Sequence, residues 1–327
     1  MKCKHYLFFL FVLYLVLPGC AQDIRVHDPV AIREGDRYYL FCRGHGISVF
    51  SSPDLKNWNR EKPVFETAPS WTKEVVPGFK NHIWAPDISF HNGKYYLYYS
   101  VSAFGKNTSA IGVATNVTLN PDDEDFEWKD HGIVVQSVPG RDMWNAIDPN
   151  LVLDETGTPW LAFGSFWGGM KLVKLAKDLV SIAGPEEWHT IAKRERDPFT
   201  ADADPGNAAI EAPFVFRKNG WYYLFVSFDF CCQGENSTYK VVAGRSEKVS
   251  GPYLDKTGKP MTKGGGSLVI EGNDRWAGAG HNSIYTFDGK DFLIFHAYDN
   301  DDGGKPKLKI MEVRWKDGWP EVDKDKL

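Results

Sequence analysis

The sequence predicts an all-β protein, a five-bladed β-propeller, because one short pattern recurs five times along the chain. Each copy has a short strand, a tight turn and a second strand rich in aromatic residues. A third strand follows in most copies, and helical periodicity is nearly absent throughout. Repetition of a unit that builds one small antiparallel sheet is typical of propeller blades arranged around a central channel.

The five copies are recognised by the residue that precedes proline, or its equivalent, at the start of the first strand. These residues are Asp28, Ala85, Asp148, Ala212 and His281. Successive copies begin 57, 63, 64 and 69 residues apart. These steps are longer than a minimal blade requires, so the loops between blades have room to form a cleft.

A glycine-containing turn joins the first two strands of each copy. The turns are Gly35-Asp36, Asn92-Gly93, Thr156-Gly157, Asn219-Gly220 and Asp288-Gly289. Asn-Gly and Asp-Gly supply the positive φ angles that tight hairpins need. The expected second strands span residues 38–41, 95–99, 160–163, 221–225 and 292–295. The expected third strands span residues 47–51, 110–115, 170–175, 239–245 and 308–313.

The first 20 residues are predicted to be a signal peptide and not part of the fold. Two lysines precede an apolar run at residues 6–17, which is too short to cross a bilayer comfortably as a mature helix. Residues 17–20, Leu-Pro-Gly-Cys, resemble a bacterial lipobox, which predicts a lipid anchor at Cys20. Proline is not usual in a lipobox, so simple cleavage near Ala21 is the alternative. We therefore expect an exported protein that is lipid-anchored at a bacterial membrane, periplasmic or secreted.

Residues 21–327 are then expected to form a single propeller domain and to be monomeric. The net charge of −5 gives no basic footprint, which argues against a nucleic-acid partner. Beyond the signal peptide only three cysteines remain, Cys42, Cys231 and Cys232, which are too few for a disulfide framework and are spaced unlike a zinc site. Adjacent cysteines can bridge only through a strained ring, so we expect Cys231 and Cys232 to be free, buried thiols.

Three carboxylates and a histidine are expected to converge at one end of the channel. The innermost strand of every blade begins at the same end, so Asp28, Asp148 and His281 should meet although they are far apart in sequence. Glu211 directly precedes the fourth start among small and apolar residues, where a charged group needs a partner or a shifted pKa. Each residue alone is commonplace, since aspartate before proline is often a turn or cap residue. Their coincidence at equivalent repeat positions indicates a catalytic site.

This set of residues suits the cleavage of a glycosidic bond. That reaction needs one protonated carboxyl group to protonate the leaving oxygen and one ionised carboxylate to activate water. Burial and neighbouring negative charge raise the pKa of the acid, so a third carboxylate can tune it.

Longer motifs surround these positions. They are His27-Asp28-Pro29, Ile83-Trp84-Ala85-Pro86-Asp87, Asn145-Ala146-Ile147-Asp148-Pro149, Phe163-Gly164-Ser165-Phe166-Trp167-Gly168-Gly169, Ile210-Glu211-Ala212-Pro213, Asn236-Ser237-Thr238-Tyr239-Lys240-Val241, Gly278-Ala279-Gly280-His281-Asn282 and His296-Ala297-Tyr298-Asp299. Over essentially the whole mature chain, the sequence resembles the endo-1,5-α-L-arabinanases of glycoside hydrolase family 43. The carboxylate motifs belong to the wider family, which includes xylosidases and arabinofuranosidases, whereas segments 165–167, 236–240 and 278–281 are more specific to arabinanases.

The resemblance implies endo-acting hydrolysis of α-1,5-L-arabinofuranosidic linkages in arabinan and arabino-oligosaccharides, with inversion of configuration. It implies Asp28 as general base, Glu211 as general acid, and Asp148 as the carboxylate that raises the pKa of the acid and positions it. It also implies a calcium ion near His281, with water as most of its ligands, and no organic cofactor. Water ligands would explain how a histidine can lie beside a cation that prefers oxygen.

The same resemblance implies a set of sugar-binding residues. Trp84 and Phe104 would stack on arabinose units. The subsites would be lined by Asn145, Ser165, Phe166 and Trp167, with Gly112 allowing close approach of the backbone.

Two other functions fit parts of the pattern. An exo-acting arabinofuranosidase or a β-xylosidase of the same family would need a blocked pocket in place of an open groove. Loop composition does not distinguish the two, although no long insertion obviously closes the channel. A non-catalytic glycan-binding propeller is the alternative from another class, since fold does not imply function. Such a protein would have no reason to keep Asp28, Asp148 and Glu211 together.

Overall fold

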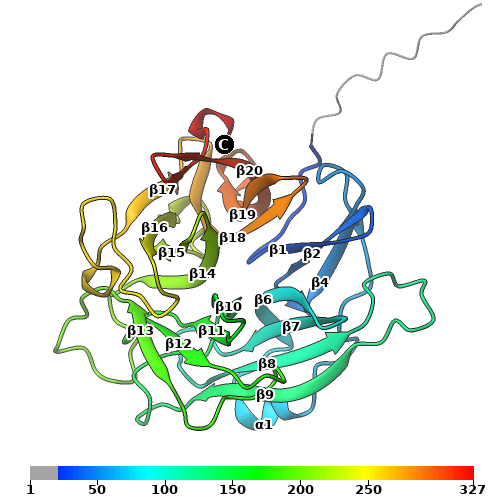
Figure 1. Ribbon diagram of the computed structural model, residues 1–327, viewed down its shortest axis with the longest axis horizontal. Coiled ribbons are helices and arrows are strands. Elements are labelled where there is room, and N and C mark those ends of the chain that lie inside the picture. The colour runs from blue at the N-terminus through cyan, green and yellow to red at the C-terminus, as the bar shows by residue number, and fades with distance from the viewer. Residues whose placement is uncertain (1–20) are drawn as a thin grey trace, which may run out of the picture.

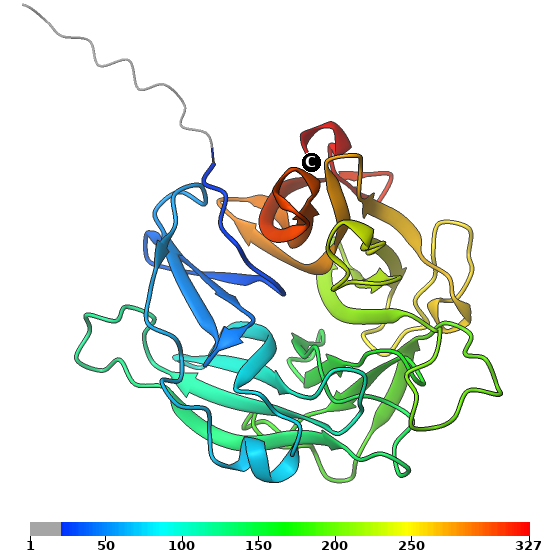
Figure 2. The same ribbon diagram turned by 180° about the vertical axis from the view of Figure 1, so that it is seen from behind.

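The computed structural model describes residues 21–327, which form five small antiparallel sheets arranged as blades around a central channel (Figures 1 and 2). Each sheet contains four strands in chain order, and the second sheet carries the short strand β3 as a fifth. The prediction of a five-bladed β-propeller is confirmed. The predicted signal peptide and the predicted anchor at Cys20 lie outside the described residues.

The strands of each blade run from the channel outward in chain order (Figure 1). Blade one contains β1 (Val30–Glu34), β2 (Arg37–Cys42), β4 (Ser48–Ser52) and β5 (Asn59–Arg60). Blade two contains β3 (Gly44–His45), β6 (His82–His91), β7 (Lys94–Val101), β8 (Ser109–Asn116) and β9 (Lys129–Ser137). Blade three contains β10 (Asn150–Leu153), β11 (Pro159–Phe163), β12 (Met170–Lys174) and β13 (Trp188–Ala192). Blade four contains β14 (Ile210–Lys218), β15 (Trp221–Phe228), β16 (Lys240–Ser246) and β17 (Ser267–Glu271). Blade five contains β18 (Trp276–Phe287), β19 (Lys290–Asp299), β20 (Lys305–Lys316) and β21 (Trp319–Glu321).

Helices in the described residues are short connectors between strands. They are α1 (Trp71–Val75), η1 (Gly234–Asn236), η2 (Met261–Lys263), η3 (Asn300–Asp302) and η4 (Lys324–Lys326). None of these helices is long and apolar enough to cross a membrane.

The first three strands of each blade overlap the predicted segments. For example, β4 covers Ser48–Ser52, where the predicted third strand spans residues 47–51. In the first hairpin Glu34 lies opposite Arg37, so the predicted glycine-containing turn joins β1 to β2. The fourth strands were not predicted because they lack a marked pattern, and β5 consists of only two exposed residues.

Aromatic and aliphatic side chains fill the spaces between neighbouring blades. The most deeply buried rings on the second strands include Tyr98, Tyr99, Tyr222 and Tyr223. One apolar cluster joins strands of blades one and two, from β1 to β8. Burial of apolar area stabilises the fold by about 25 cal/mol per Å², so these interfaces hold the blades against one another.

The first described residues close the ring. The N–H group of Leu308 donates to the carbonyl of Ile24 (3.1 Å), and that of Val26 donates to the carbonyl of Pro306 (3.3 Å). Residues 24–26 therefore pair with β20 of the last blade before the chain enters blade one. These main-chain hydrogen bonds join the first and last blades of the propeller.

The residue that starts each blade has a left-handed backbone conformation. The φ angles are 57° at Asp28, 32° at Ala85, 58° at Asp148, 54° at Ala212 and 51° at His281. This conformation costs a residue other than glycine about 1–2 kcal/mol, so it persists only where the surrounding structure imposes it. Register shifts also interrupt strand pairing near three of these starts, in β6, β14 and β18.

Side chains of the preceding blade hold four of these five residues. The backbone N–H of Asp28 donates to His296 Nδ1 (3.3 Å), and that of Asp148 donates to Ser100 Oγ (2.9 Å). The N–H of Ala212 donates to Asp148 Oδ2 (3.0 Å), and that of His281 donates to Ser227 Oγ (2.8 Å). Each N–H group bonds to the neighbouring blade and not to a strand partner, so the regular strand pattern is broken at the point where the functional side chains lie.

Candidate active site

The predicted carboxylates lie together at one end of the channel. Asp28 and Asp148 are buried, and Glu211 is half-buried. Burial raises the pKa of Asp148, and the nearby charges of Glu211 and then Asp28 raise it further. His281 completes the group, since its Nδ1 atom lies 3.0 Å from Asp28 Oδ1. The structure therefore brings together all four residues that the repeat positions single out.

Asp28 is held as an anion by two histidines. His27 Nδ1 donates to Asp28 Oδ1 at 2.5 Å, and His281 Nδ1 contacts the same oxygen. Burial by itself raises the pKa of Asp28, but the charges of His27 and His281 outweigh burial and hold the pKa well below its usual range. An ionised carboxylate in this position can accept a proton from water.

His27 was not among the predicted site residues. Its Nε2 atom donates to the hydroxyl of Tyr298 at 2.8 Å, and its ring lies 3.9 Å from the ring of His296. Burial lowers the pKa of His27, yet the adjacent Asp28 raises it to about 10. The residue is thus a fixed cation beside the carboxylate. Its place directly before Asp28 in the repeat was the only sequence signal available.

Glu211 has a different set of partners. The hydroxyl of Ser165 donates to Oε2 at 2.7 Å, and the hydroxyl of Tyr239 donates to Oε1. The thiol of Cys231 lies 3.6 Å from Oε1. Burial raises the pKa of Glu211, and the hydrogen bonds from Tyr239 and Ser165 offset this rise only in part. A carboxyl group that keeps its proton can act as a general acid.

Asp148 supports the position of Glu211 through the backbone. Its Oδ2 atom accepts the N–H of Ala212, the residue that follows Glu211. Burial and then the charge of Glu211 raise the pKa of Asp148 well above its ordinary value. Asp148 therefore fixes the start of the strand that carries Glu211 and itself keeps its proton more readily than an ordinary aspartate.

Six of the seven predicted sugar-binding residues line one cavity of about 300 Å³, together with Glu211. These six are Trp84, Phe104, Asn145, Ser165, Phe166 and Trp167. We call this space the catalytic cavity. Phe104 is 77% exposed, so its ring is free to stack on a ligand. Asn145 Oδ1 is buried without a hydrogen-bond partner in residues 21–327.

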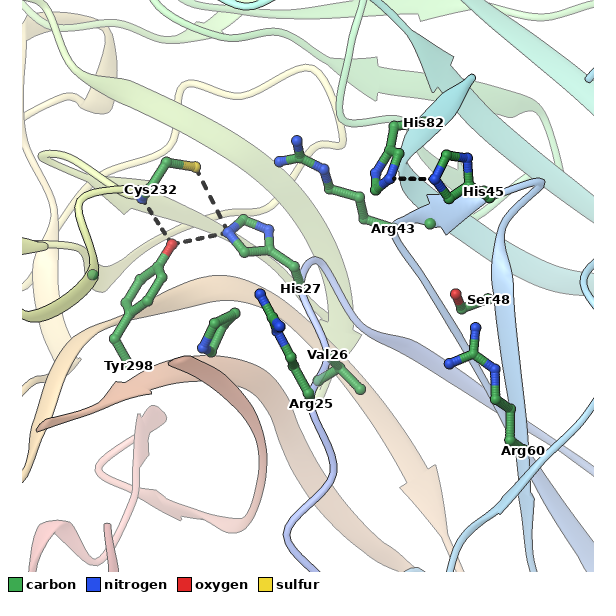
Figure 3. A pocket seen from close by; sticks show the side chains of 13 residues that line it. Arg25, Val26, His27, Arg43, His45, Ser48, Arg60, His82, Cys232 and Tyr298 are labelled. Atoms are coloured by element: carbon green, nitrogen blue, oxygen red, sulfur yellow. Dashed lines mark hydrogen bonds between the residues drawn. The ribbon is translucent and has the colours of Figure 1, made fainter. Parts of the chain in front are cut away.

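Two further cavities adjoin the catalytic cavity. The lateral cavity, about 800 Å³, shares Trp84 and Phe104 with it. The arginine cavity, about 550 Å³, shares Arg43 and His82 with the lateral cavity and Cys232 with the catalytic cavity (Figure 3). The shared walls make the three cavities sections of one groove.

Gly112 lies elsewhere. It belongs to β8, and a Cβ atom added there would lie 2.6 Å from the ring of Tyr99 and 2.7 Å from that of Trp71. It does not line any of the three sections of the groove. The structure therefore does not bring Gly112 to the sugar-binding residues, and the absence of a side chain there allows two aromatic rings to pack.

The two adjacent cysteines lie in the site, which the sequence did not indicate. Both are free thiols, as predicted, but Cys231 is half-buried and Cys232 is exposed, so the prediction that both are buried was wrong. Ligand atoms of His27, Cys231 and Cys232 lie within 4.8 Å of one another, although cysteine spacing matched no metal site. The spacing of the cysteines did not reveal this cluster because its third member, His27, comes from the start of another blade.

The surroundings of His281 offer few ligand atoms for the predicted calcium ion. Its Nδ1 atom faces Asp28, so Nε2 is the atom left for another ligand. Within residues 21–327 its ion-pair partner is one carboxylate, Asp28. Calcium takes six to eight oxygen ligands, and these residues do not provide such a cage. Water would have to supply most of the coordination.

The chain is similar to known proteins over most of its length. The profile of glycosyl hydrolases family 43 matches residues 22–320. The chain is 56% identical over 308 residues to extracellular exo-α-(1→5)-L-arabinofuranosidase ArbA of Cellvibrio japonicus, covering 94% of this chain and 89% of that protein. It is 46% identical over 307 residues to extracellular endo-α-(1→5)-L-arabinanase 1 of Bacillus subtilis, covering 92% and 88%. A solved structure of Cellvibrio cellulosa α-L-arabinanase complexed with arabinohexaose matches with a TM-score of 0.91 and 56% identity, covering 92% of this chain and 96% of that one.

We predict that iodoacetamide at pH 6 will modify Cys232 rapidly and leave Cys42 unmodified. Hydrogen bonding from Cys231, and then from His27, lowers the pKa of Cys232 to about 4 against the opposing effect of burial. Burial raises the pKa of Cys42 to about 12. Labelling is measured by peptide mass spectrometry over time, and a His27→Gln variant should slow the reaction of Cys232 several-fold. Equal labelling of Cys42 and Cys232 would contradict the prediction.

Proposed function

The chain belongs to glycosyl hydrolase family 43, and from this premise we propose that it hydrolyses α-1,5-L-arabinofuranosidic linkages within arabinan, with inversion of configuration. The observation that carries the proposal is a pair of neighbouring carboxyl groups in different surroundings: Glu211 lines the aromatic-rich catalytic cavity, and Asp28 is buried close enough for its charge to act on Glu211. Asp28 is paired with histidines, and Glu211 accepts hydrogen bonds from hydroxyl groups. Such different surroundings are what a base and an acid need when both are carboxyl groups.

The proposed reaction uses both groups in one step. Asp28 takes a proton from a water molecule as that water attacks the anomeric carbon, while Glu211 protonates the departing glycosidic oxygen. His27 and His281 keep Asp28 ionised and oriented before the step. Asp148 accepts a hydrogen bond from the backbone N–H of Ala212 and so holds the start of the strand that carries Glu211.

Endo action is the main proposal because the catalytic cavity shares lining residues with both the lateral cavity and the arginine cavity, so that the three form one groove. Exo action is the second candidate, since the relative that is 56% identical is named an exo-acting arabinofuranosidase. The 46% identical relative is named an endo-acting arabinanase. The distinction depends on whether a chain can extend past the cleavage point at both ends.

We also propose that the mature chain is exported and carries a lipid anchor at Cys20. Export is supported by two relatives that are named extracellular proteins, and the anchor is supported only by the lipobox-like segment at residues 17–20.

Asp28→Asn and Glu211→Gln should each lower kcat on linear α-1,5-arabinan by ~10²–10⁴-fold, because each removes one proton-transfer step. Products are followed over time by chromatography, and the anomeric configuration of the first product by ¹H NMR. Matched controls are Asp36→Asn and Glu247→Gln, which change exposed carboxylates away from the groove.

The product pattern decides the mode of action. A ladder of intermediate oligosaccharides that is absent from the two variants supports endo hydrolysis. Monomer or one short product from the earliest times indicates exo hydrolysis in place of endo hydrolysis. Turnover near the wild-type rate in either variant removes that residue from the mechanism, and a retained anomeric configuration rules out the inverting assignment.

Tyr239→Phe should move the basic limb of the kcat/KM profile upward by about one pH unit. Burial raises the pKa of Glu211, and the Tyr239 hydroxyl lowers it by stabilising the ionised form. Loss of that hydroxyl leaves the pKa higher still, so the acid stays protonated to higher pH. The control is Tyr223→Phe, which removes a hydroxyl bonded to the carbonyl of Gly318 at 2.6 Å. A downward shift in the Tyr239 variant would count against Glu211 as the acid.

We propose that a calcium ion binds beside His281 with water as most of its ligands. Dialysis against EDTA should lower Tm, and added calcium should restore it, because a ligand of the folded state stabilises by about 2.7 kcal/mol at 100 times Kd. His281→Ala should abolish the difference, whereas the control His189→Ala should retain it. A Tm that EDTA does not change in the wild type would refute calcium binding.

A further inference from the structure

The arginine cavity is rich in basic side chains although the chain as a whole has a net charge of −5. Six basic side chains line it, namely Arg25, His27, Arg43, His45, Arg60 and His82 (Figure 3). No aspartate or glutamate of residues 21–327 forms part of its wall. The adjoining lateral cavity adds Lys80 and Lys106, again without a carboxylate from the described chain.

The three guanidinium groups of this cavity lack partners of opposite charge. Within the part of the chain that the structure describes, no ion pair or side-chain hydrogen bond involves Arg25, Arg43 or Arg60. Elsewhere, Arg33 pairs with Asp288 at 2.6 Å and Arg194 pairs with Asp229 at 2.6 Å. Within residues 21–327, Arg217 and Arg314 also have no ion-pair partner, but neither lines the groove. The arginine cavity is distinguished by gathering three unpaired guanidinium groups in one wall.

Aromatic rings hold two of the guanidinium groups in place. Arg43 lies over the ring of Trp84, 4.8 Å from its centroid, and Arg60 lies over the ring of Phe50 at 5.8 Å. Cation–π contact leaves the N–H groups of a guanidinium available at its edge. Since Trp84 also lines the catalytic cavity, Arg43 connects the cationic section of the groove to the proposed sugar-binding section.

A histidine pair adds further polar groups. His45 Nε2 and His82 Nε2 lie 3.1 Å apart, so one ring donates a hydrogen bond to the other (Figure 3). His82 Nδ1 is buried and has no hydrogen-bond partner in residues 21–327. A buried polar atom without a partner is costly unless a ligand or water satisfies it. The residue His82 itself lines both the arginine cavity and the lateral cavity.

We propose that the arginine cavity binds the carboxylate of a uronic acid unit in the saccharide that occupies the groove. A guanidinium group matches a carboxylate through two parallel hydrogen bonds. The volume of about 550 Å³ accommodates a sugar-sized ligand and exceeds what a small inorganic anion needs. This inference rests on the proposed function, because continuity with the catalytic cavity makes a saccharide the expected ligand.

The test compares two ligands of the same shape that differ in charge. The probes are a trimer of α-1,4-linked galacturonic acid and its fully methyl-esterified form, and binding to the full mature chain is measured by calorimetry. We expect the acidic trimer to bind about 10-fold more tightly than the ester, since hydrogen bonds to charged groups are the stronger ones. Higher salt should reduce this preference.

Variants then assign the preference to the cavity. Arg25→Ala with Arg60→Ala should weaken binding of the acidic trimer about 10-fold and bring it close to that of the ester. The matched control is Arg217→Ala, an exposed arginine on β14 outside the groove, which should keep the preference. Single variants, checked for folding by circular dichroism, replace the double variant if it does not fold.

Three results would overturn the proposal. Equal binding of the acidic and esterified trimers by the wild type would exclude carboxylate recognition, without the need for any variant. An undiminished preference in the arginine variants would place recognition elsewhere. Displacement of the trimer by sulfate at the same concentration would show a site for small anions. Arabinan hydrolysis is assayed separately, so failure of the inference is distinguishable from failure of the proposed function.

Discussion

Hydrogen bonds between neighbouring blades fix the left-handed residues from which the active site is built. In four of five blades, the N–H group of the starting residue donates to a side chain of the preceding blade. The bond from Ala212 to Asp148 belongs to this set and joins the surroundings of two carboxylates. The strained φ angles therefore depend on correct packing of adjacent blades. The site can form only when the ring is closed, which the pairing of residues 24–26 with β20 provides.

Within that frame, the environment separates two chemically similar groups. Asp28 shares one oxygen with two histidines, so burial is outweighed and the carboxylate stays ionised. Glu211 faces neutral donors from Ser165 and Tyr239, which do not outweigh burial, so the carboxyl group keeps its proton more readily. The difference lies in the charge of the partners and not in the depth of burial.

The groove shows a corresponding division between aromatic and cationic walls. Aromatic rings such as Phe104 and Phe166 line the catalytic cavity, where the apolar faces of neutral sugars can pack. Unpaired arginines line the section beyond His27, where no carboxylate of the described chain compensates them. Arg43 lies over Trp84 at the boundary, so the same contact belongs to both sections. The division suggests that the two sections recognise different features of one saccharide.

The sequence alone determined the five blades, since hairpin turns and strand patterns are local and repeat at similar steps. Equivalence of repeat positions was also enough to identify Asp28, Asp148, Glu211 and His281. Only the tertiary structure decided their partners, because His27, Tyr239, Cys231 and the arginines reach the groove from different blades and loops. It likewise showed that Gly112 packs against Tyr99 away from the groove. Local patterns set where each blade begins, whereas the contacts that set charge and hydrogen bonding join residues as much as 271 positions apart.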